Sequence, residues 1–130
     1  MKDIFENWSK VFEVDRRLDA AYVLGSAVRG GLRVSSDIDL ALLPAPRMTL
    51  TAPDLAELAE RLTYIAGRPV DSGILSSRNL IYAHQAILTG KCVWLRAGTS
   101  VELRIATLLG LYVRFQFDRR EVLDAYTVKA

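Results

Sequence analysis

The sequence contains little cysteine and histidine and no long apolar run. With one cysteine, Cys92, the chain cannot form an internal disulfide, which fits a reducing cytoplasm. The one histidine, His84, has no Cys, His or acidic neighbour at metal-ligand spacing, so we interpret it as a structural or surface residue. Residues 1–10 mix acids, bases and aromatics and do not resemble a signal peptide. No apolar run is long enough to span a membrane, and we therefore expect a cytoplasmic protein.

An excess of charge is also lacking. A net charge of +2 over 130 residues is too small to require a nucleic acid as partner, and we expect no direct nucleic-acid binding. Arginines outnumber lysines, and the guanidinium group suits bidentate contacts with phosphate, although an ordinary surface position is the better interpretation for most of these arginines. The length predicts one domain, residues 1–130, with a real hydrophobic core.

What the sequence does contain is a strand, a turn and a second strand in its first third. An apolar run over residues 20–24 predicts a buried strand. It ends at Gly25 and Ser26, where glycine permits a sharp turn and serine suits a helix N-cap. The free backbone N–H groups of a helix start attract phosphate. Ten further residues separate Ser26 from a second apolar strand over residues 37–43.

Two aspartates open the second strand. In a strand, side chains two residues apart point the same way, so Asp37 and Asp39 are expected to lie side by side. Carboxylates held that close repel each other unless a cation lies between them, and oxygen ligands of this kind suit Mg²⁺. A phosphate-binding turn beside a metal-binding pair fits metal-assisted transfer of a nucleotide. An Asp-x-Asp pair alone is also compatible with a solvated acidic turn, so the interpretation depends on the whole combination.

The combination of Gly25-Ser26, a ten-residue spacer and Asp37-Ile38-Asp39 resembles the signature of the nucleotidyltransferase superfamily related to DNA polymerase beta. Arg29-Gly30 in the spacer is similar to the Gly-Ser-x-x-Arg-Gly pattern of its small members. The resemblance is greatest to the minimal nucleotidyltransferases, many of which are encoded beside a HEPN-domain ribonuclease toxin and act as its antitoxin. The clear motif covers residues 20–43, and a weaker match covers residues 71–94.

The resemblance implies a metal site of three carboxylates. Asp37 and Asp39 would hold two Mg²⁺ ions, and a third carboxylate on the next strand would complete the site. Asp71, in the apolar stretch 68–75, occupies that place in the order of elements. Ser72-Gly73 departs from the apolar residues that relatives usually show, which leaves a loop aspartate as the alternative for Asp71.

The resemblance also implies a nucleotide site. Gly25 and Ser26 would bind the phosphates of ATP, and Arg29 would neutralise the charge that develops there. For Arg29 a surface salt bridge is the alternative.

The remaining segments predict an α+β fold with a short mixed β-sheet and helices mainly on one face, and the resemblance implies that this fold is a small nucleotidyltransferase domain. Apolar periodicity and capping residues predict helices over 3–18, 52–66, 78–88 and 100–126 and further strands over 68–75 and 91–95. Thr51 and Asp54 form a candidate capping box for the second helix, and Gly67 closes it.

The last predicted helix carries two apolar stripes. The first stripe, which we assign to the domain core, contains Val101, Ile105, Leu108, Tyr112, Phe115, Val122 and Tyr126. At about 100° per residue, the second stripe lies nearly opposite and contains Leu103, Ala106, Gly110, Val113 and Phe117. Either a bound partner, the HEPN-domain toxin, covers this second stripe, or the domain encloses the helix itself.

The resemblance to the minimal nucleotidyltransferases implies a Mg-dependent antitoxin that transfers AMP from ATP to a tyrosine hydroxyl of a cognate HEPN ribonuclease toxin and thereby neutralises it. Two alternatives stay open. One is a small-molecule transferase of the aminoglycoside-modifying type, which usually needs a further domain to hold the drug. The other is an antitoxin that acts by binding alone, which leaves the set of three aspartates unexplained.

Overall fold

Four strands form one mixed sheet in the computed structural model, which describes residues 2–25, 37–98 and 100–128. Their order across the sheet is β3-β2-β1-β4. Strand β1 pairs antiparallel with both β2 and β4, and β2 pairs parallel with β3. The strands are β1 (Leu18–Leu24), β2 (Ile38–Pro44), β3 (Val70–Ile74) and β4 (Lys91–Leu95). The prediction of a short mixed sheet is confirmed.

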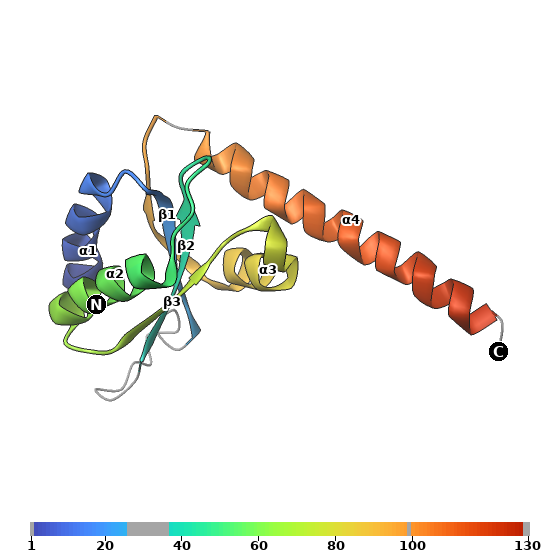
Figure 1. Ribbon diagram of the computed structural model, residues 1–130, viewed down its shortest axis with the longest axis horizontal. Coiled ribbons are helices and arrows are strands. Elements are labelled where there is room, and N and C mark those ends of the chain that lie inside the picture. The colour runs from blue at the N-terminus through green and yellow to red at the C-terminus, as the bar shows by residue number, and fades with distance from the viewer. Residues whose placement is uncertain (1, 26–36, 99, 129–130) are drawn as a thin grey trace.

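Four helices accompany the sheet (Figure 1). They are α1 (Lys2–Val14), α2 (Ala52–Ala66), α3 (Leu80–Thr89) and α4 (Val101–Val128), with a 3₁₀ turn, η2 (Ser77–Asn79), before α3. The predicted capping box of α2 is present, since Thr51 and Asp54 each accept a hydrogen bond from the other's backbone N–H. Gly67 ends α2 with a φ of 69°, in the left-handed region that glycine tolerates. No helix in the described ranges is long and apolar enough to cross a membrane.

The helices cover both faces of the sheet, so the expectation that they pack mainly on one face was wrong (Figure 1). On one face α1 and α2 bury Trp8, Phe12, Leu58 and Leu62 against the sheet. On the other face α3 and α4 bury Ala83, Ala86, Val101 and Leu108. The cause is that β1 and β2 are apolar at nearly every position, and strand side chains alternate between the two faces, so both faces need a cover.

Only the first part of α4 packs on the domain. Val101 and Leu108 are buried, and the ring of Tyr112 stacks on that of His84 with 3.6 Å between centroids. The later part of α4 projects from the body (Figure 1), and nearly all of the described side chains after Tyr112 are exposed. The stripe that we assigned to the core therefore serves it only as far as Tyr112, and its later members Phe115, Val122 and Tyr126 are exposed.

Candidate functional site

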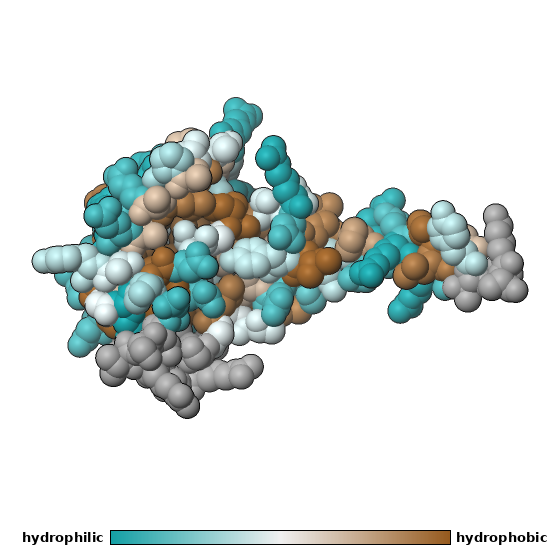
Figure 2. All heavy atoms as spheres, turned by 60° about the horizontal axis from the view of Figure 1, so that its bottom comes forward, coloured by the Kyte–Doolittle hydropathy of each residue, from teal (hydrophilic) through white to brown (hydrophobic). Residues whose placement is uncertain are grey.

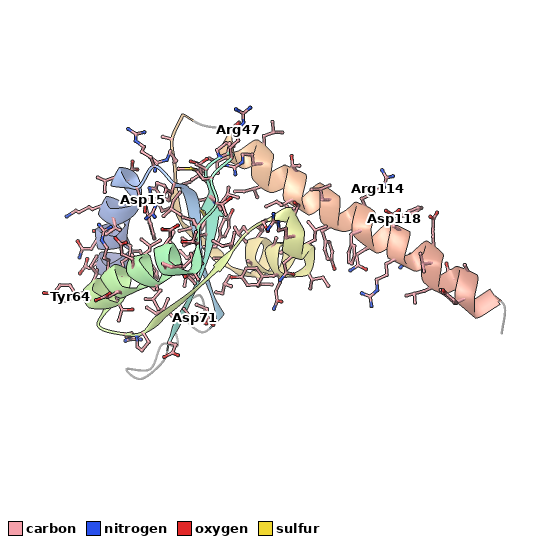
Figure 3. All side chains as sticks on the ribbon, viewed as in Figure 1. Asp15, Arg47, Tyr64, Asp71, Arg114 and Asp118 are labelled. Atoms are coloured by element: carbon pink, nitrogen blue, oxygen red, sulfur yellow. The ribbon has the colours of Figure 1, made fainter. Side chains whose placement is uncertain are left out.

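Three of the predicted site residues lie at one end of the sheet, where β1 ends and β2 and β3 begin. Asp39 on β2 and Asp71 on β3 are direct partners in the parallel register. Asp39 is also paired with Leu24 on β1, the residue before Gly25. Figure 3 shows Asp71 at this end of the sheet. Gly25, Asp39 and Asp71 are thus brought together from three strands.

Of the other predicted site residues, only Asp37 lies within the described residues. Asp37 immediately precedes β2 and is exposed, and its carboxylate contributes to the field at Asp39. Ser26 and Arg29 lie outside the described residues.

This end of the sheet carries several carboxylates close to one another. Partial loss of solvent contact, followed by the nearby carboxylates of Asp71 and Asp37, raises the pKa of Asp39 above its ordinary value, although its side chain stays exposed. Within the described ranges, no lysine or arginine forms a salt bridge with Asp37, Asp39 or Asp71. Like charges without a counter-charge repel, so binding a cation here would relieve the repulsion.

The donor set fits a hard cation. All three candidate ligands are carboxylates, and oxygen ligands are those that Mg²⁺ prefers. In the part of the chain that the structure describes, no three acidic, histidine or cysteine side chains converge closely enough to enclose an ion on their own. Mg²⁺ commonly completes its shell with water and substrate phosphates, so a site built around Asp39 and Asp71 suits an ion that is shared with a nucleotide.

Gly25 brings the backbone close to the carboxylate of Asp39. Its φ is 68°, a conformation that other residues rarely adopt, which confirms the predicted turn. A Cβ atom at this position would lie 3.8 Å from Oδ2 of Asp39. A branched side chain at Gly25 would therefore strain the backbone and crowd the space above that carboxylate.

Helix α3 supplies a site residue that sequence reasoning missed, Tyr82. Burial, followed by the carboxylates of Asp39 and Asp71, raises the pKa of its phenol, which places the ring in the field of both carboxylates. The ring lies over Gly73 of β3, where a Cβ atom would come within 2.8 Å of Tyr82 Cζ. Gly73, the departure from the apolar pattern of relatives, thus makes room for Tyr82. The available signal was the spacing of Tyr82, Gln85 and Thr89, which places three polar groups along one side of a helix.

Two hollows adjoin at this end of the sheet. Both are lined by Leu24, Asp39 and Tyr82. The larger, of about 360 Å³, adds Gly25, Gln85, Ala86 and Thr89 to the lining. The smaller, of about 230 Å³, adds Leu40, Asp71, Ser72 and Gly73. Two adjoining spaces that share the carboxylate of Asp39 suit a reaction between two substrates.

Comparison with known proteins agrees with this geometry. The profile of the family described as "Polymerase beta, Nucleotidyltransferase" matches residues 6–98. The protein adenylyltransferase MntA of Shewanella oneidensis is 31% identical over 110 residues, which cover 83% of this chain and 76% of MntA.

Solved structures show the same fold. A chain from a toxin–antitoxin structure with AMP-PNP is 25% identical, with a TM-score of 0.72 and coverage of 97% of this chain and 98% of that one. A chain from the structure of a tri-AMPylated Shewanella oneidensis HEPN toxin in complex with MNT antitoxin is 27% identical, with a TM-score of 0.66 and coverage of 98% and 99%. From the family profile and the extent of these similarities, the chain belongs to the polymerase beta nucleotidyltransferase family.

Proposed function

We propose that this chain is an antitoxin that transfers AMP from ATP to a tyrosine hydroxyl of a cognate HEPN-domain toxin and so silences it. The observation that carries the proposal is the pairing of Asp39 with Asp71 beside the turn at Gly25. The similarity to a protein adenylyltransferase, and to chains from complexes with AMP-PNP and with an AMPylated HEPN toxin, supports the choice of nucleotide and acceptor.

Each residue of the site has a role in this reaction. Asp37, Asp39 and Asp71 would hold two Mg²⁺ ions, which neutralise the triphosphate and make the acceptor hydroxyl a better nucleophile when bound. Backbone at Gly25 binds the phosphates, together with Ser26 and Arg29. A bond forms between the tyrosine oxygen and the α-phosphorus, and the bond to pyrophosphate breaks. Asp71 accepts the proton that the hydroxyl loses.

The toxin binds, in this proposal, to the second stripe of α4. Leu103, Val113 and Phe117 are 68%, 66% and 62% exposed, so the domain does not enclose this side of the helix. Figure 2 shows apolar side chains among hydrophilic ones on the part of α4 that projects from the body. The small residues Ala106 and Gly110 are also exposed and would let a partner helix approach closely. An unburied apolar stripe of this kind marks an interaction surface.

We place the reaction in the cytoplasm and assign it to residues 1–130 as one minimal domain. Transfer of AMP consumes ATP, and the single cysteine suits a reducing compartment.

The test is to incubate the chain with Mg²⁺, α-labelled ATP and its HEPN-domain partner. We expect the label on a tyrosine of the partner, together with loss of its ribonuclease activity. Asp39→Asn should still form the complex but leave the partner unlabelled and active, whereas Asp3→Asn, an exposed aspartate in the first turn of α1, should behave like wild type. If Asp39→Asn silences the toxin as well as wild type does, binding suffices and enzymatic neutralisation has to be abandoned.

A second variant separates docking from chemistry. Phe117→Glu places a charge in the proposed interface, where an unpaired buried charge costs several kcal/mol, in the range of about 3–5. We expect it to abolish the complex and slow labelling while AMP-PNP still binds. Normal complex formation by this variant would exclude the second stripe of α4 as the docking surface.

A further inference from the structure

We propose that Tyr82 is a positioning residue that separates the two substrates of the transfer reaction. The larger hollow then holds the nucleotide, and the smaller hollow receives the tyrosine side chain of the toxin. This assignment rests on the proposed function and adds to it the place of each substrate.

The larger hollow suits the nucleotide because, as far as the described residues go, only this hollow is lined by Gly25, the turn that binds the phosphates in the proposed reaction. Gln85 and Thr89 line it from α3 and supply amide and hydroxyl groups that can bind a base or ribose. Thr89 Oγ1 donates to the carbonyl oxygen of Gln85 at 2.6 Å, which leaves the hydroxyl oxygen able to accept a further hydrogen bond. Its volume of about 360 Å³ is also the larger of the two.

The smaller hollow suits a single side chain. Of the two hollows, as the described residues line them, only the smaller includes Asp71, the carboxylate that takes the acceptor proton in the proposed reaction. Leu24 and Leu40 add apolar lining, and Tyr82 adds an aromatic ring, so the space of about 230 Å³ suits the ring of a tyrosine side chain.

Tyr82 is fixed at the boundary by its neighbours. The helix that carries it starts at a cap, in which Asn79 Oδ1 accepts from the backbone N–H of Tyr82 at 3.2 Å. Its ring lies against Gly73, with no space for a side chain at that position. Because Tyr82 lines both hollows, truncation of its side chain would merge them and remove the surface that holds the acceptor ring beside Asp71. Water, which already reaches the exposed Asp39, would then compete with the acceptor hydroxyl.

The first test measures where the AMP group goes. Tyr82→Ala should lower the ratio of toxin labelling to AMP released by hydrolysis at least tenfold, whereas Tyr82→Phe, which keeps the ring, should preserve the ratio. Tyr64→Ala, at a tyrosine that is 91% exposed on α2, is the matched control. A purely structural role would reduce transfer and hydrolysis together, so an unchanged ratio in Tyr82→Ala overturns the proposal.

The second test determines which hollow binds the nucleotide. Thr89→Trp should narrow the larger hollow, raise the KM for ATP about tenfold and leave the KM for the toxin unchanged. A raised KM for the toxin with an unchanged KM for ATP would reverse the assignment and overturn it. If wild type does not label the toxin at all, the proposed function fails. Titration with AMP-PNP then still tests whether the larger hollow binds the nucleotide. Weaker AMP-PNP binding by Thr89→Trp supports this assignment, and unchanged binding overturns it.

Discussion

Asp19, near the start of β1, and Asp39, near the start of β2, lie at opposite ends of the sheet because these strands are antiparallel. Asp19 is 3% exposed and has two arginines beside it, with Arg104 Nη1 at 2.7 Å and Arg96 Nε at 3.4 Å. Asp39 is exposed and has Asp71 and Asp37 as its charged neighbours. Figure 3 marks the two ends through Asp15 and Asp71.

The arginines at the Asp19 end also connect the elements of the fold. Arg96 donates to the carbonyl oxygens of Phe12, in the last turn of α1, and of Asp15, directly after it. Arg104 donates to the carbonyl oxygen of Pro44, at the end of β2. Negative charge at this end is therefore neutralised by the protein, whereas at the Asp39 end no salt bridge between described residues involves Asp37, Asp39 or Asp71. The difference indicates that the first end serves stability and that the second is organised for a ligand that brings positive charge.

The largest effect that this comparison predicts is at Asp19. Asp19→Asn keeps the shape of the side chain but leaves two guanidinium groups without their carboxylate. Breaking a buried ion pair costs about 3–5 kcal/mol, and we expect the lower end, about 3 kcal/mol, because the Arg104 side chain is 28% exposed. Urea unfolding measures the loss. Asp71→Asn, at the other end, is the matched control and should not destabilise the protein; an equal loss in both variants would remove the distinction between the ends.

Binding of Mg²⁺ is the next largest effect. An ion that binds only the folded state at a hundred times its dissociation constant stabilises by about 2.7 kcal/mol. We expect Mg²⁺ with AMP-PNP to raise the melting temperature of wild type and of Arg17→Gln, but not of Asp39→Asn. An identical shift in Asp39→Asn would show that the ion binds elsewhere.

Much of the Asp39 end could be predicted because its signals are local in the sequence. The turn at Gly25 and the alternation from Asp37 to Asp39 depend on residues close together along the chain. The exact register that places Asp71 opposite Asp39 is set by parallel pairing across α2, which the sequence alone does not define. Tyr82 was missed for the same reason, since its role depends on Gly73 from a different strand.

The burial of Asp19 and its pairing with arginines could not be predicted from the sequence. Arg104 lies 85 residues from Asp19, and no local pattern marks a buried aspartate whose partners come from the other end of the chain. The coverage of both sheet faces was missed because continuous apolar runs were taken only as buried strands. Such runs also require a helix layer on each side.

Arg17→Gln gives a smaller effect, which changes with pH. Arg17 donates to both carboxylate oxygens of Asp15, from Nε at 2.9 Å and Nη2 at 2.8 Å, and holds the pKa of Asp15 below its ordinary value of 3.8. A carboxyl group whose pKa is lower in the folded than in the unfolded protein stabilises the fold at pH values above its unfolded pKa. This contribution is lost as the pH falls through the folded pKa. We expect Arg17→Gln to cost about 1 kcal/mol at pH 7 and almost nothing at pH 2, because Arg17 is partly exposed. An undiminished cost at pH 2 would contradict the charge-based explanation.

The smallest predicted effect on stability is a gain and not a loss. The pKa of Asp39 is raised in the folded state, so stability falls as the pH rises from the ordinary value of 3.8 through the raised pKa, and stays lower above it. Without divalent ions, Asp39→Asn should therefore stabilise the protein at pH 7 by a few tenths of a kcal/mol, a small gain because the exposed charge is screened by solvent. The gain should vanish near pH 3 and shrink in about 1 M salt, where the screening length is roughly 3 Å. Urea unfolding of wild type and variant at the two pH values and at low and high salt measures it. A loss of stability at pH 7 would mean that Asp39, like Asp19, is neutralised by the protein itself, and the two ends of the sheet would then no longer differ in kind.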